Sequence, residues 1–303
     1  MIYITENELG YLIQEERYSE RVKKHNDWII QQFVDSKKLE GVSENTISNY
    51  VRYMHMLSDG IGKNFEDMTA KNIKAYMTEY QSSRRVTNNT MDNMRLVFSS
   101  FYNYLVEEDF VIKNPMRKIH KIKGEKVIKS PFTDDDIIHI QDSCRGIREK
   151  ALIDFLYSTG CRVSEVCDLN VRDVDFINKE VLVFGKGSKE RVVYFDARTK
   201  IHLHQYIESR TDTNPALFVT DQAPFNRISK TGIEYIVANI GQRAKVPLCH
   251  PHRFRRTLAT RLIDRGVPIE QVQRLLGHTK IDTTLIYAQV SQRNVKMSHN
   301  KFA

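Results

Sequence analysis

The apolar residues of this chain follow two different periods, and the point where the period changes limits the folds that it can adopt. Over most of the sequence they recur at helical spacing, which places them on one face of a helix. From Glu180 to Phe195 the pattern becomes VLVF, a GKGSKE turn and RVVYF, which predicts a β-hairpin. We therefore expect a mainly α protein with a small β-sheet in its C-terminal domain.

Helix signals follow one another over residues 20–112, after an N-terminal extension of residues 1–19. A first segment has an apolar face made of Trp28, Ile29 and Phe33. Residues that favour a helix start precede three more segments, at Ser43, Thr69 and Thr87. We interpret the aromatic and methionine stripes of these segments as the core of a helical domain.

Residues 113–131 differ in composition and are predicted to link two domains. Seven Lys or Arg stand against one acidic residue, Glu125, over residues 113–129, and a proline and a glycine interrupt any helix there. A solvated connector explains this run. A segment that lies against DNA phosphates through Lys121 and Lys123 explains it too.

A second domain is predicted over residues 132–303, with a C-terminal tail from about residue 289. Thr133 and the three aspartates after it are typical of a helix start. Gly160 is expected to end a helix over residues 147–159. The hairpin follows, and helices then return toward the C-terminus.

The net charge of +8 favours a polyanionic partner such as nucleic acid, although a merely basic surface would explain it as well. The four cysteines lack the paired spacing of a metal site, so we predict reduced thiols, no metal and no cofactor. No apolar run reaches about eighteen residues, and no secretion signal is recognisable. We expect a cytoplasmic, nucleoid-associated protein without a membrane partner.

Two motifs in the first half of the second domain present cations. TGCRVSE places Arg162 after the expected helix end, with Glu165 three residues later. A surface ion pair is the simpler interpretation of these two residues. GKGSKER presents Lys186 between two glycines, where the backbone is free to approach a ligand closely. A solvated turn lysine is the simpler interpretation there.

Two motifs near the C-terminus add histidines and a tyrosine. HRFR puts His252 and Arg255 three residues apart, on one helical face; His250 is a rival, but the spacing favours His252. GHTKIDTTLIY begins at Gly277, which is expected to end a helix, and puts His278 directly after it and Tyr287 nine residues later. The apolar residues expected to hold this last piece down are Leu275, Leu276, Ile281 and Ile286.

Together and in this order, TGCRVSE, GKGSKER, HRFRRT, LLGH and TTLIYA resemble the catalytic boxes of the tyrosine recombinases, the phage-integrase family. The resemblance is greatest to Xer-like recombinases and short integrases of mobile elements, and it covers nearly the whole chain. It implies a two-domain DNA clamp, with a helical, SAM-like core-binding domain over residues 20–112 and a tyrosine recombinase catalytic domain from residue 132.

The resemblance also assigns roles to the residues that match the family's boxes. It implies that Tyr287 is the nucleophile and that Glu165 supports the site. The other catalytic positions that it implies are Arg162, Lys186, His252, Arg255 and His278. The chain departs from the family at Arg256, where a histidine usually follows the second arginine; this puts the fine tuning of the site in doubt.

These residue types suit DNA cleavage without ATP or metal. A phenolic oxygen keeps the energy of the phosphodiester bond by forming a 3′-phosphotyrosyl ester, which the freed 5′-hydroxyl later attacks in reverse. A phenol with a pKa near 10 is a poor nucleophile at neutral pH. Guanidinium groups can hold the non-bridging oxygens and offset the charge of the transition state, while histidine and lysine transfer protons.

The resemblance further implies that double-stranded DNA recombination sites are the partner and that a homo-tetramer forms through exchange of the C-terminal tail. We favour integration or excision of a mobile element. The alternatives are Xer-type chromosome dimer resolution, type IB topoisomerase-like relaxation and a non-catalytic DNA-binding regulator. Whether a second recombinase or a DNA-bending accessory protein takes part is left open.

The helical domain also offers candidate DNA contacts, each of which could equally be a solvated surface residue. They are Asn45, Asn49, Arg52, Arg84, Arg85, Asn89 and Arg95.

Overall fold

The computed structural model describes residues 6–124, 130–185, 190–278 and 280–288, and for residues 6–18, 282 and 288 it describes the backbone only. The chain divides into two compact units, Met1–Val127 and Ile128–Ala303. Within these described ranges, no helix combines the length and the apolar character that crossing a membrane requires.

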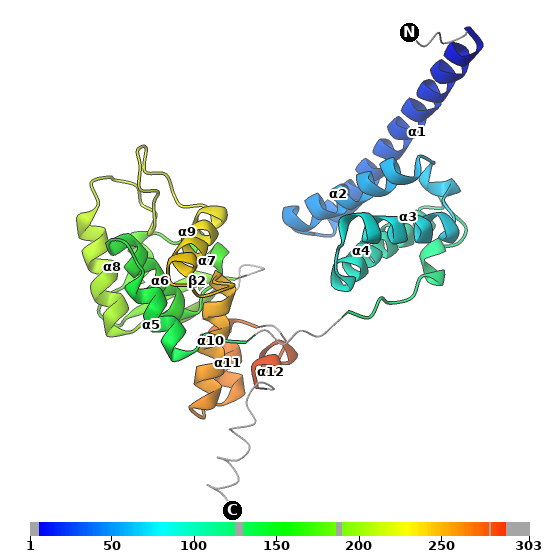
Figure 1. The fold of residues 1–303 in the computed structure, drawn as a ribbon. Coiled ribbons are helices and arrows are strands. Elements are labelled where there is room, and N and C mark those ends of the chain that lie inside the picture. Colours follow the sequence, from blue (N-terminus) through cyan, green and yellow to red (C-terminus); the bar gives the residue numbers. More distant parts are fainter. Residues whose placement is uncertain (1–5, 125–129, 186–189, 279, 289–303) are drawn as a thin grey trace, which may run out of the picture. The chain divides into compact units, whose positions relative to one another are not determined.

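The first unit is helical. Its longer helices are α1 (Glu6–Leu39), α2 (Glu44–Ile61), α3 (Ala70–Arg84) and α4 (Asn88–Glu107), and its short 3₁₀ turns are η1 (Phe65–Asp67) and η2 (Pro115–Lys118) (Figure 1). The predicted start residues stand at the N-caps: Thr69 accepts a hydrogen bond from the backbone of Asn72, and Thr87 accepts one from the backbone of Thr90. The expected run of helices is therefore confirmed.

An aromatic cluster forms the core of this unit. The ring centroid of Phe101 lies 5.2 Å from that of Phe33 and 4.7 Å from that of Phe65, both edge-on. Ile29 and Phe33 are fully buried as predicted, but Trp28 is 50% exposed. The prediction for Trp28 was wrong because this residue lies at the margin of the buried stripe, where its ring packs on Phe110.

Part of the predicted linker packs onto the helices of this unit. Met116 is buried, and Asp92 on α4 accepts a hydrogen bond from the backbone of Ile122 at 3.0 Å. Asn88 donates to the carbonyl of Lys123 at 2.9 Å. These contacts hold the backbone that carries the basic residues up to Lys123 against the helical unit.

The second unit surrounds α6 with helices and one small sheet. Its elements are α5 (Asp134–Asp142), α6 (Ile147–Thr159), α7 (Val163–Asp168), η3 (Val171–Asp173), β1 (Val174–Asp175), β2 (Glu180–Phe184), β3 (Glu190–Tyr194), α8 (Ala197–Ser209), α9 (Lys230–Arg243), α10 (Pro251–Asp264), α11 (Ile269–Leu276) and α12 (Asp282–Ala288) (Figure 1). The described strands pair antiparallel in the order β1-β2-β3. The expected fold class, mainly α with a small sheet, is confirmed.

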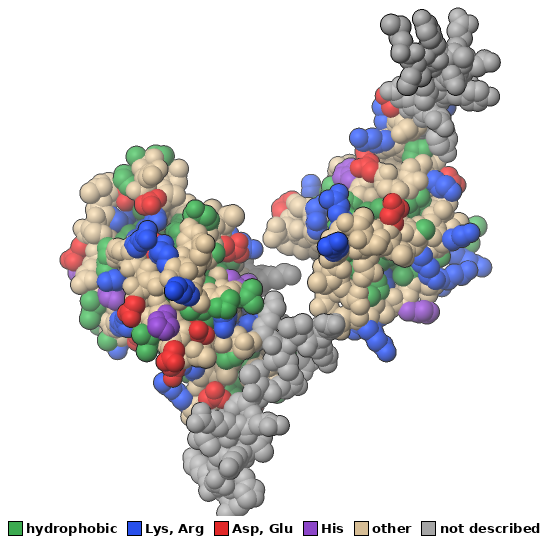
Figure 2. Space-filling model, viewed as in Figure 1, with side chains coloured by type: hydrophobic (Ala, Val, Ile, Leu, Met, Phe, Trp, Pro, Cys, Tyr) green, Lys and Arg blue, Asp and Glu red, His purple; other side chains and the backbone are tan. Residues whose placement is uncertain are grey.

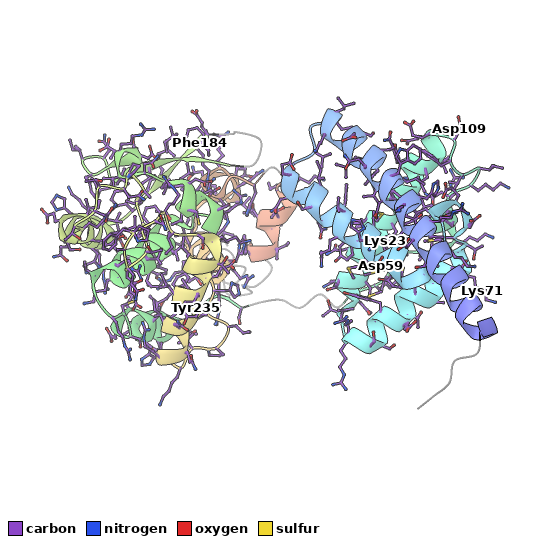
Figure 3. The ribbon with its side chains drawn as sticks, turned by 90° about the horizontal axis from the view of Figure 1, so that it is seen from above. Lys23, Asp59, Lys71, Asp109, Phe184 and Tyr235 are labelled. Atoms are coloured by element: carbon purple, nitrogen blue, oxygen red, sulfur yellow. The ribbon has the colours of Figure 1, made fainter. Side chains whose placement is uncertain are left out.

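The hairpin has one buried and one exposed face. Val181, Val183 and Val193 point into the core, whereas the alternate residues Phe184 and Tyr194 are each 56% exposed. Phe184 lies at the periphery of its unit (Figure 3). Arg191 pairs with Val183 and therefore belongs to the inward face of β3.

Glycines end two helices next to one another in space. Gly160 ends α6 with φ +60° and Gly277 ends α11 with φ +62°, which is the left-handed conformation that glycine adopts most readily. A Cβ on Gly160 would lie 2.8 Å from a methyl carbon of Leu258 on α10. Both predicted helix ends are confirmed, and both expose backbone carbonyls to the side chains described next.

Candidate active site

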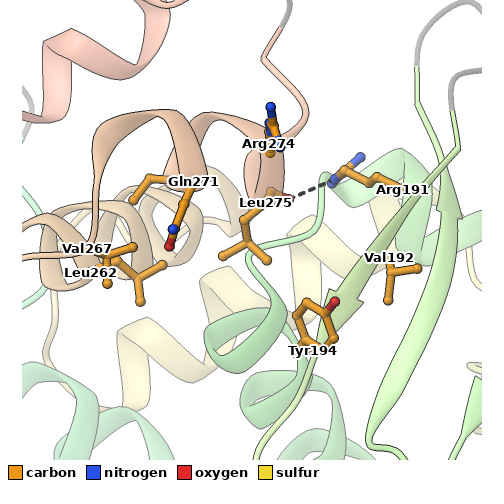
Figure 4. Close-up of a pocket in the computed structure, with 9 residues that line it drawn as sticks. Arg191, Val192, Tyr194, Leu262, Val267, Gln271, Arg274 and Leu275 are labelled. Carbon is orange, nitrogen blue, oxygen red and sulfur yellow. Dashed lines mark hydrogen bonds between the residues drawn. The ribbon is translucent and has the colours of Figure 1, made fainter.

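The C-terminal end of α11 collects arginines from three other elements. Arg191 on β3 donates from Nε to the carbonyl of Leu275 at 2.9 Å (Figure 4), Arg255 on α10 donates from Nη2 to the carbonyl of Leu276, and Arg162 donates from Nη2 to the carbonyl of Gly277 at 3.0 Å. The last carbonyls of a helix have no partner within the helix and carry partial negative charge. Three consecutive carbonyls therefore fix three guanidinium groups that would otherwise repel one another.

Glu165 binds two of these arginines. It is 4% exposed, and its carboxylate accepts from Arg162 Nη1 at 2.8 Å and from the two Nη atoms of Arg191 at 2.7 Å each. Burial acts to raise the pKa of this carboxyl, but the hydrogen bonds and charge of Arg191, followed by those of Arg162, outweigh it and keep the pKa below its usual value. The simple interpretation of Arg162 and Glu165 as a surface pair was wrong, because the carboxylate is buried.

Arg255 is 3% exposed and joins the ends of two helices. Its Nη1 donates to the carbonyl of Gly160 at 2.8 Å, at the end of α6, while Nη2 binds the end of α11. Burial, with the nearby charge of Arg162, lowers the pKa of Arg255 to about 10. The guanidinium is still protonated at neutral pH, so a positive charge is held in a site with little water.

His278 and Tyr287 stack beside this group. Their ring centroids are 6.0 Å apart with 28° between the ring planes, and His278 Nδ1 lies 2.9 Å from the buried hydroxyl oxygen of Thr284. Burial and the charges of Arg255, Arg162 and Arg191 lower the pKa of His278 to about 4. The imidazole is therefore neutral at pH 7, and Nδ1 either accepts from the Thr284 hydroxyl or donates to it, depending on which ring nitrogen carries the proton.

Tyr287 is partly buried and packs on a small cluster formed by α10 and α11, which lie beside α12 (Figure 1). Leu276 is fully buried in that cluster. Ile281 and Ile286 are 38% and 57% exposed, so the prediction that they anchor this piece was wrong. Ile286 lies on the solvent side of α12 because Tyr287 and Thr284 occupy its inner side, and Ile281 belongs to the turn that precedes this helix.

His252 and Arg256 lie on either side of Arg255 along α10. His252 is largely exposed, but the surrounding protein displaces enough water, and Arg255 adds enough positive charge, to lower its pKa. Partial burial lowers the pKa of the Arg256 guanidinium, and nearby Tyr287 acts in the opposite direction. The rival histidine, His250, stands at the N-cap of α10.

The structure brings together Arg162, Glu165, Arg255, His278 and Tyr287 from distant parts of the sequence. Lys186 lies outside the described residues, as does the tail from residue 289. No group of three or more His, Cys, Asp or Glu side chains in the described parts of the chain is arranged to hold a metal ion.

Sequence reasoning missed Arg191. A signal was present, because Arg191, Val193 and Phe195 alternate along the strand and so share its inward face. An arginine on an inward face requires a buried acceptor. The sequence held no sign that this acceptor would be Glu165 together with a backbone carbonyl.

The candidate DNA contacts of the helical unit differ in how far their side chains are exposed to solvent. Most are exposed: Asn45, Arg52, Arg84, Arg85, Asn89, Lys121 and Lys123. Arg52 also donates to Asn49 at 2.8 Å. By contrast, the Arg95 side chain is 14% exposed and donates to Asp92 at 2.7 Å, so it contributes to the packing of its own unit. On the face shown in Figure 2, Lys and Arg side chains are spread over each unit among acidic ones.

The chain matches known proteins over both units. Residues 119–294 match the phage integrase family, and residues 29–111 match the N-terminal SAM-like domain of phage integrases. The tyrosine recombinase XerC of Bacillus subtilis is 32% identical over 88% of this chain and 94% of its own length. The tyrosine recombinase XerA of Pyrococcus horikoshii is 29% identical over 93% of this chain and 96% of its own.

Solved structures share the fold at lower sequence identity. The Tn1549 transposon integrase in complex with a circular intermediate DNA superimposes with a TM-score of 0.73 at 18% identity, over 91% of this chain and 99% of that one. A lambda integrase dimer bound to a COC′ core site superimposes with a TM-score of 0.70 at 18% identity, over 86% of this chain and 76% of that one.

Proposed function

The chain belongs to the phage integrase family and is a site-specific tyrosine recombinase, and we propose that Tyr287 is the nucleophile with which it cuts DNA. Members of this family cut and rejoin DNA through a tyrosine-linked intermediate and need neither ATP nor metal. One observation carries the assignment: the Tyr287 ring stacks on His278 beside Arg162 and Arg255, and these two guanidinium groups are held by hydrogen bonds to the carbonyls of Gly277 and Gly160.

In the proposed cleavage step, the Tyr287 oxygen attacks the scissile phosphorus and the bond to the 5′ oxygen breaks. Arg162 and Arg255 hold the non-bridging oxygens. A guanidinium has five N–H groups, and the protein contacts described above use two on each of these arginines, so donors remain for a phosphate. Positive charge fixed in advance at a developing oxyanion lowers the barrier without reorganisation.

Proton transfer is assigned to the remaining residues of the set. His252 is proposed to accept the phenolic proton, and its lowered pKa supports this because it keeps the imidazole neutral and able to accept. Neutral His278 is proposed to donate from Nε2 to a phosphate oxygen, in the tautomer whose Nδ1 accepts from the Thr284 hydroxyl. Lys186 is proposed to protonate the departing 5′ oxygen.

The helical unit is proposed to bind the DNA duplex through its exposed Arg, Lys and Asn side chains, and the protein to act in the cytoplasm, on the nucleoid. Integration or excision of a mobile element is the role we propose. Xer-type resolution is the second candidate, favoured by the Bacillus and Pyrococcus relatives, both of which are Xer recombinases. Mapping the DNA site that the protein cuts separates the two roles. A site within a mobile element supports integration or excision, and a site in the host chromosome supports Xer-type resolution.

Four copies are proposed to assemble on two duplexes through exchange of the C-terminal tail, with a second recombinase or a DNA-bending protein as optional partners. A groove of about 430 Å³ between β3 and the α10–α11 pair, lined by Val192, Tyr194, Leu262, Val267 and Leu275 among others, offers an apolar acceptor surface (Figure 4). Deletion of residues 291–303 should abolish synapsis in a gel-shift assay. Undiminished synapsis would contradict tail exchange.

A suicide substrate with a nick near the cleavage position tests the nucleophile. The wild-type protein should become covalently attached to this DNA, and Tyr287→Phe should not. Tyr235→Phe is the matched control, since Tyr235 is 69% exposed on α9 and lies outside the candidate site. Adduct formation by the Tyr287 variant would overturn the assignment. Efficient relaxation of a plasmid without recombination sites would instead favour topoisomerase-like activity.

A further inference from the structure

Arg191 connects the buried carboxylate of the candidate site to the helix end from which His278 follows. We propose that Arg191 is a positioning residue for DNA cleavage. It offsets the negative charge of Glu165, so that this carboxylate does not cancel the positive charge with which Arg162 binds the phosphate. It also fixes the end of α11. The proposal rests on the proposed function of Arg162 and His278. It adds to the reaction a residue that does not itself contact DNA.

The contacts of Arg191 use both sides of its guanidinium. Nη1 and Nη2 lie 2.7 Å from the two oxygens of Glu165, and Nε lies 2.9 Å from the carbonyl oxygen of Leu275. The side chain is 10% exposed, and it extends from β3 toward α11 (Figure 4). A group held on two sides and withdrawn from solvent acts on the substrate through its neighbours.

The charges of this cluster show what Arg191 contributes. Glu165 and Arg162 alone would form a neutral pair, in which the buried carboxylate cancels the charge of the proposed phosphate ligand. Arg191 adds a second cation to the same carboxylate, so the three groups together keep one net positive charge. Charges interact strongly where water is excluded, so this balance bears directly on how firmly Arg162 can hold a phosphate oxygen.

The geometry of Gly277 is adapted to the same side chain. A Cβ at this position would lie 2.9 Å from Cδ of Arg191 and 3.1 Å from its Nη1, and the backbone has φ +62°. A glycine here lets α11 end directly against the guanidinium. The next residue is His278, so Arg191 sets where the chain leaves the helix on its way to Thr284 and Tyr287.

Lysine could not replace these contacts. An ammonium group is a single point charge, whereas the planar guanidinium matches both oxygens of a carboxylate and still presents Nε to a third acceptor. Arg191→Lys should therefore keep part of the charge effect and lose the fixed geometry. Arg191→Gln should lose both.

Single-turnover cleavage of the nicked suicide DNA by the full-length protein tests the proposal, with DNA affinity measured in parallel. Arg191→Gln should slow cleavage by about a hundredfold, the scale of one lost charge-stabilising donor, while the Kd for DNA changes less than about threefold. Arg191→Lys should fall between this variant and wild type. Arg243→Gln is the matched control, since it breaks another partly buried arginine–carboxylate pair, with Glu149, in the same unit.

Two readouts separate positioning from mere structural support. Glu165→Gln combined with Arg191→Gln should restore cleavage at least about tenfold over Arg191→Gln, because no buried carboxylate then competes for Arg162. The loss of cleavage rate in Arg191→Gln, relative to wild type, should also be smaller on DNA with an uncharged methylphosphonate at the scissile position, because this group has no negative charge for Arg162 to offset. If Arg191→Gln does not fold, Arg191→Lys and the double variant supply the same comparisons.

The outcomes are distinct. Cleavage by Arg191→Gln or Arg191→Lys at the wild-type rate would overturn the positioning role, as would a double variant that is no faster than Arg191→Gln. In either case Tyr287-dependent adduct formation by the wild-type protein would leave the proposed function standing. A wild-type protein that forms no adduct on the nicked DNA would overturn both.

Discussion

Arg162 and Arg255 in the second unit are held differently from Arg52 and Arg84 in the first. In the second unit, Arg162 and Arg255 bind backbone carbonyls at helix ends, and Arg255 is almost completely buried. In the first unit, Arg52 and Arg84 are exposed on helix surfaces; Arg52 donates to Asn49 and lies over the ring of Tyr53, both on its own helix. Cations held in one place can stabilise the charge that develops at a single phosphate during cleavage. Exposed arginines on a helix surface can instead bind phosphates along the DNA backbone.

The largest effect should come from a fixed arginine. Arg255→Lys keeps a positive charge but loses the fork that binds the carbonyls of Gly160 and Leu276, so single-turnover cleavage should fall about a hundredfold to a thousandfold. The Kd for DNA, measured by fluorescence anisotropy, should change only severalfold. Loss of affinity and cleavage in equal proportion would show that Arg255 serves binding and not the transition state.

An exposed arginine should have a smaller effect of a different kind. Arg52→Ala should weaken DNA binding severalfold and reduce the slope of log affinity against log salt by about one, as expected for one lost phosphate contact. Arg95→Ala, its matched control, should leave the salt slope unchanged and lower the melting temperature, because Arg95 is paired with Asp92. Equal changes of the salt slope in Arg52→Ala and Arg95→Ala would contradict the proposal that Arg52 contacts a DNA phosphate and Arg95 does not.

The smallest effect should appear in the dependence of stability on pH. Burial and neighbouring arginines lower the pKa of His278 to about 4, against about 6.5 in the unfolded chain. The unfolded state therefore binds more protons between these values, and stability attributable to His278 is present above about pH 6.5 and is lost as the pH falls toward 4. His278→Gln should flatten the curve of melting temperature against pH in this window. An unchanged curve would contradict a neutral, charge-surrounded imidazole.

The difference between side-chain and backbone partners explains how much could be predicted from the sequence. The period change over residues 180–195, the helix ends at Gly160 and Gly277, and the start at Thr133 are local features, and each was predicted correctly. The family's motifs named the residues of the candidate site in order. No motif marks a backbone carbonyl, so the contacts of the arginines with the end of α11 were not predicted.

The errors arose where burial depends on distant segments. Trp28 and Ile286 have the apolar character of core residues, but both lie at the margin of a buried stripe, and helical spacing alone does not give its width. Arg191 was missed for the opposite reason: it was placed at the start of the second strand, but no role was assigned to a charged residue at an inward position. Its partner Glu165 lies 26 residues earlier in the sequence.

We propose that the cations held around the end of α11 act on a single phenol, that of Tyr287. Mass spectrometry of the protein trapped on nicked DNA, after nuclease and protease digestion, tests this most directly. We expect the nucleotide remnant on the peptide that contains Tyr287, attached through its phenolic oxygen. A remnant on another side chain, or a wild-type protein that carries none, would contradict it.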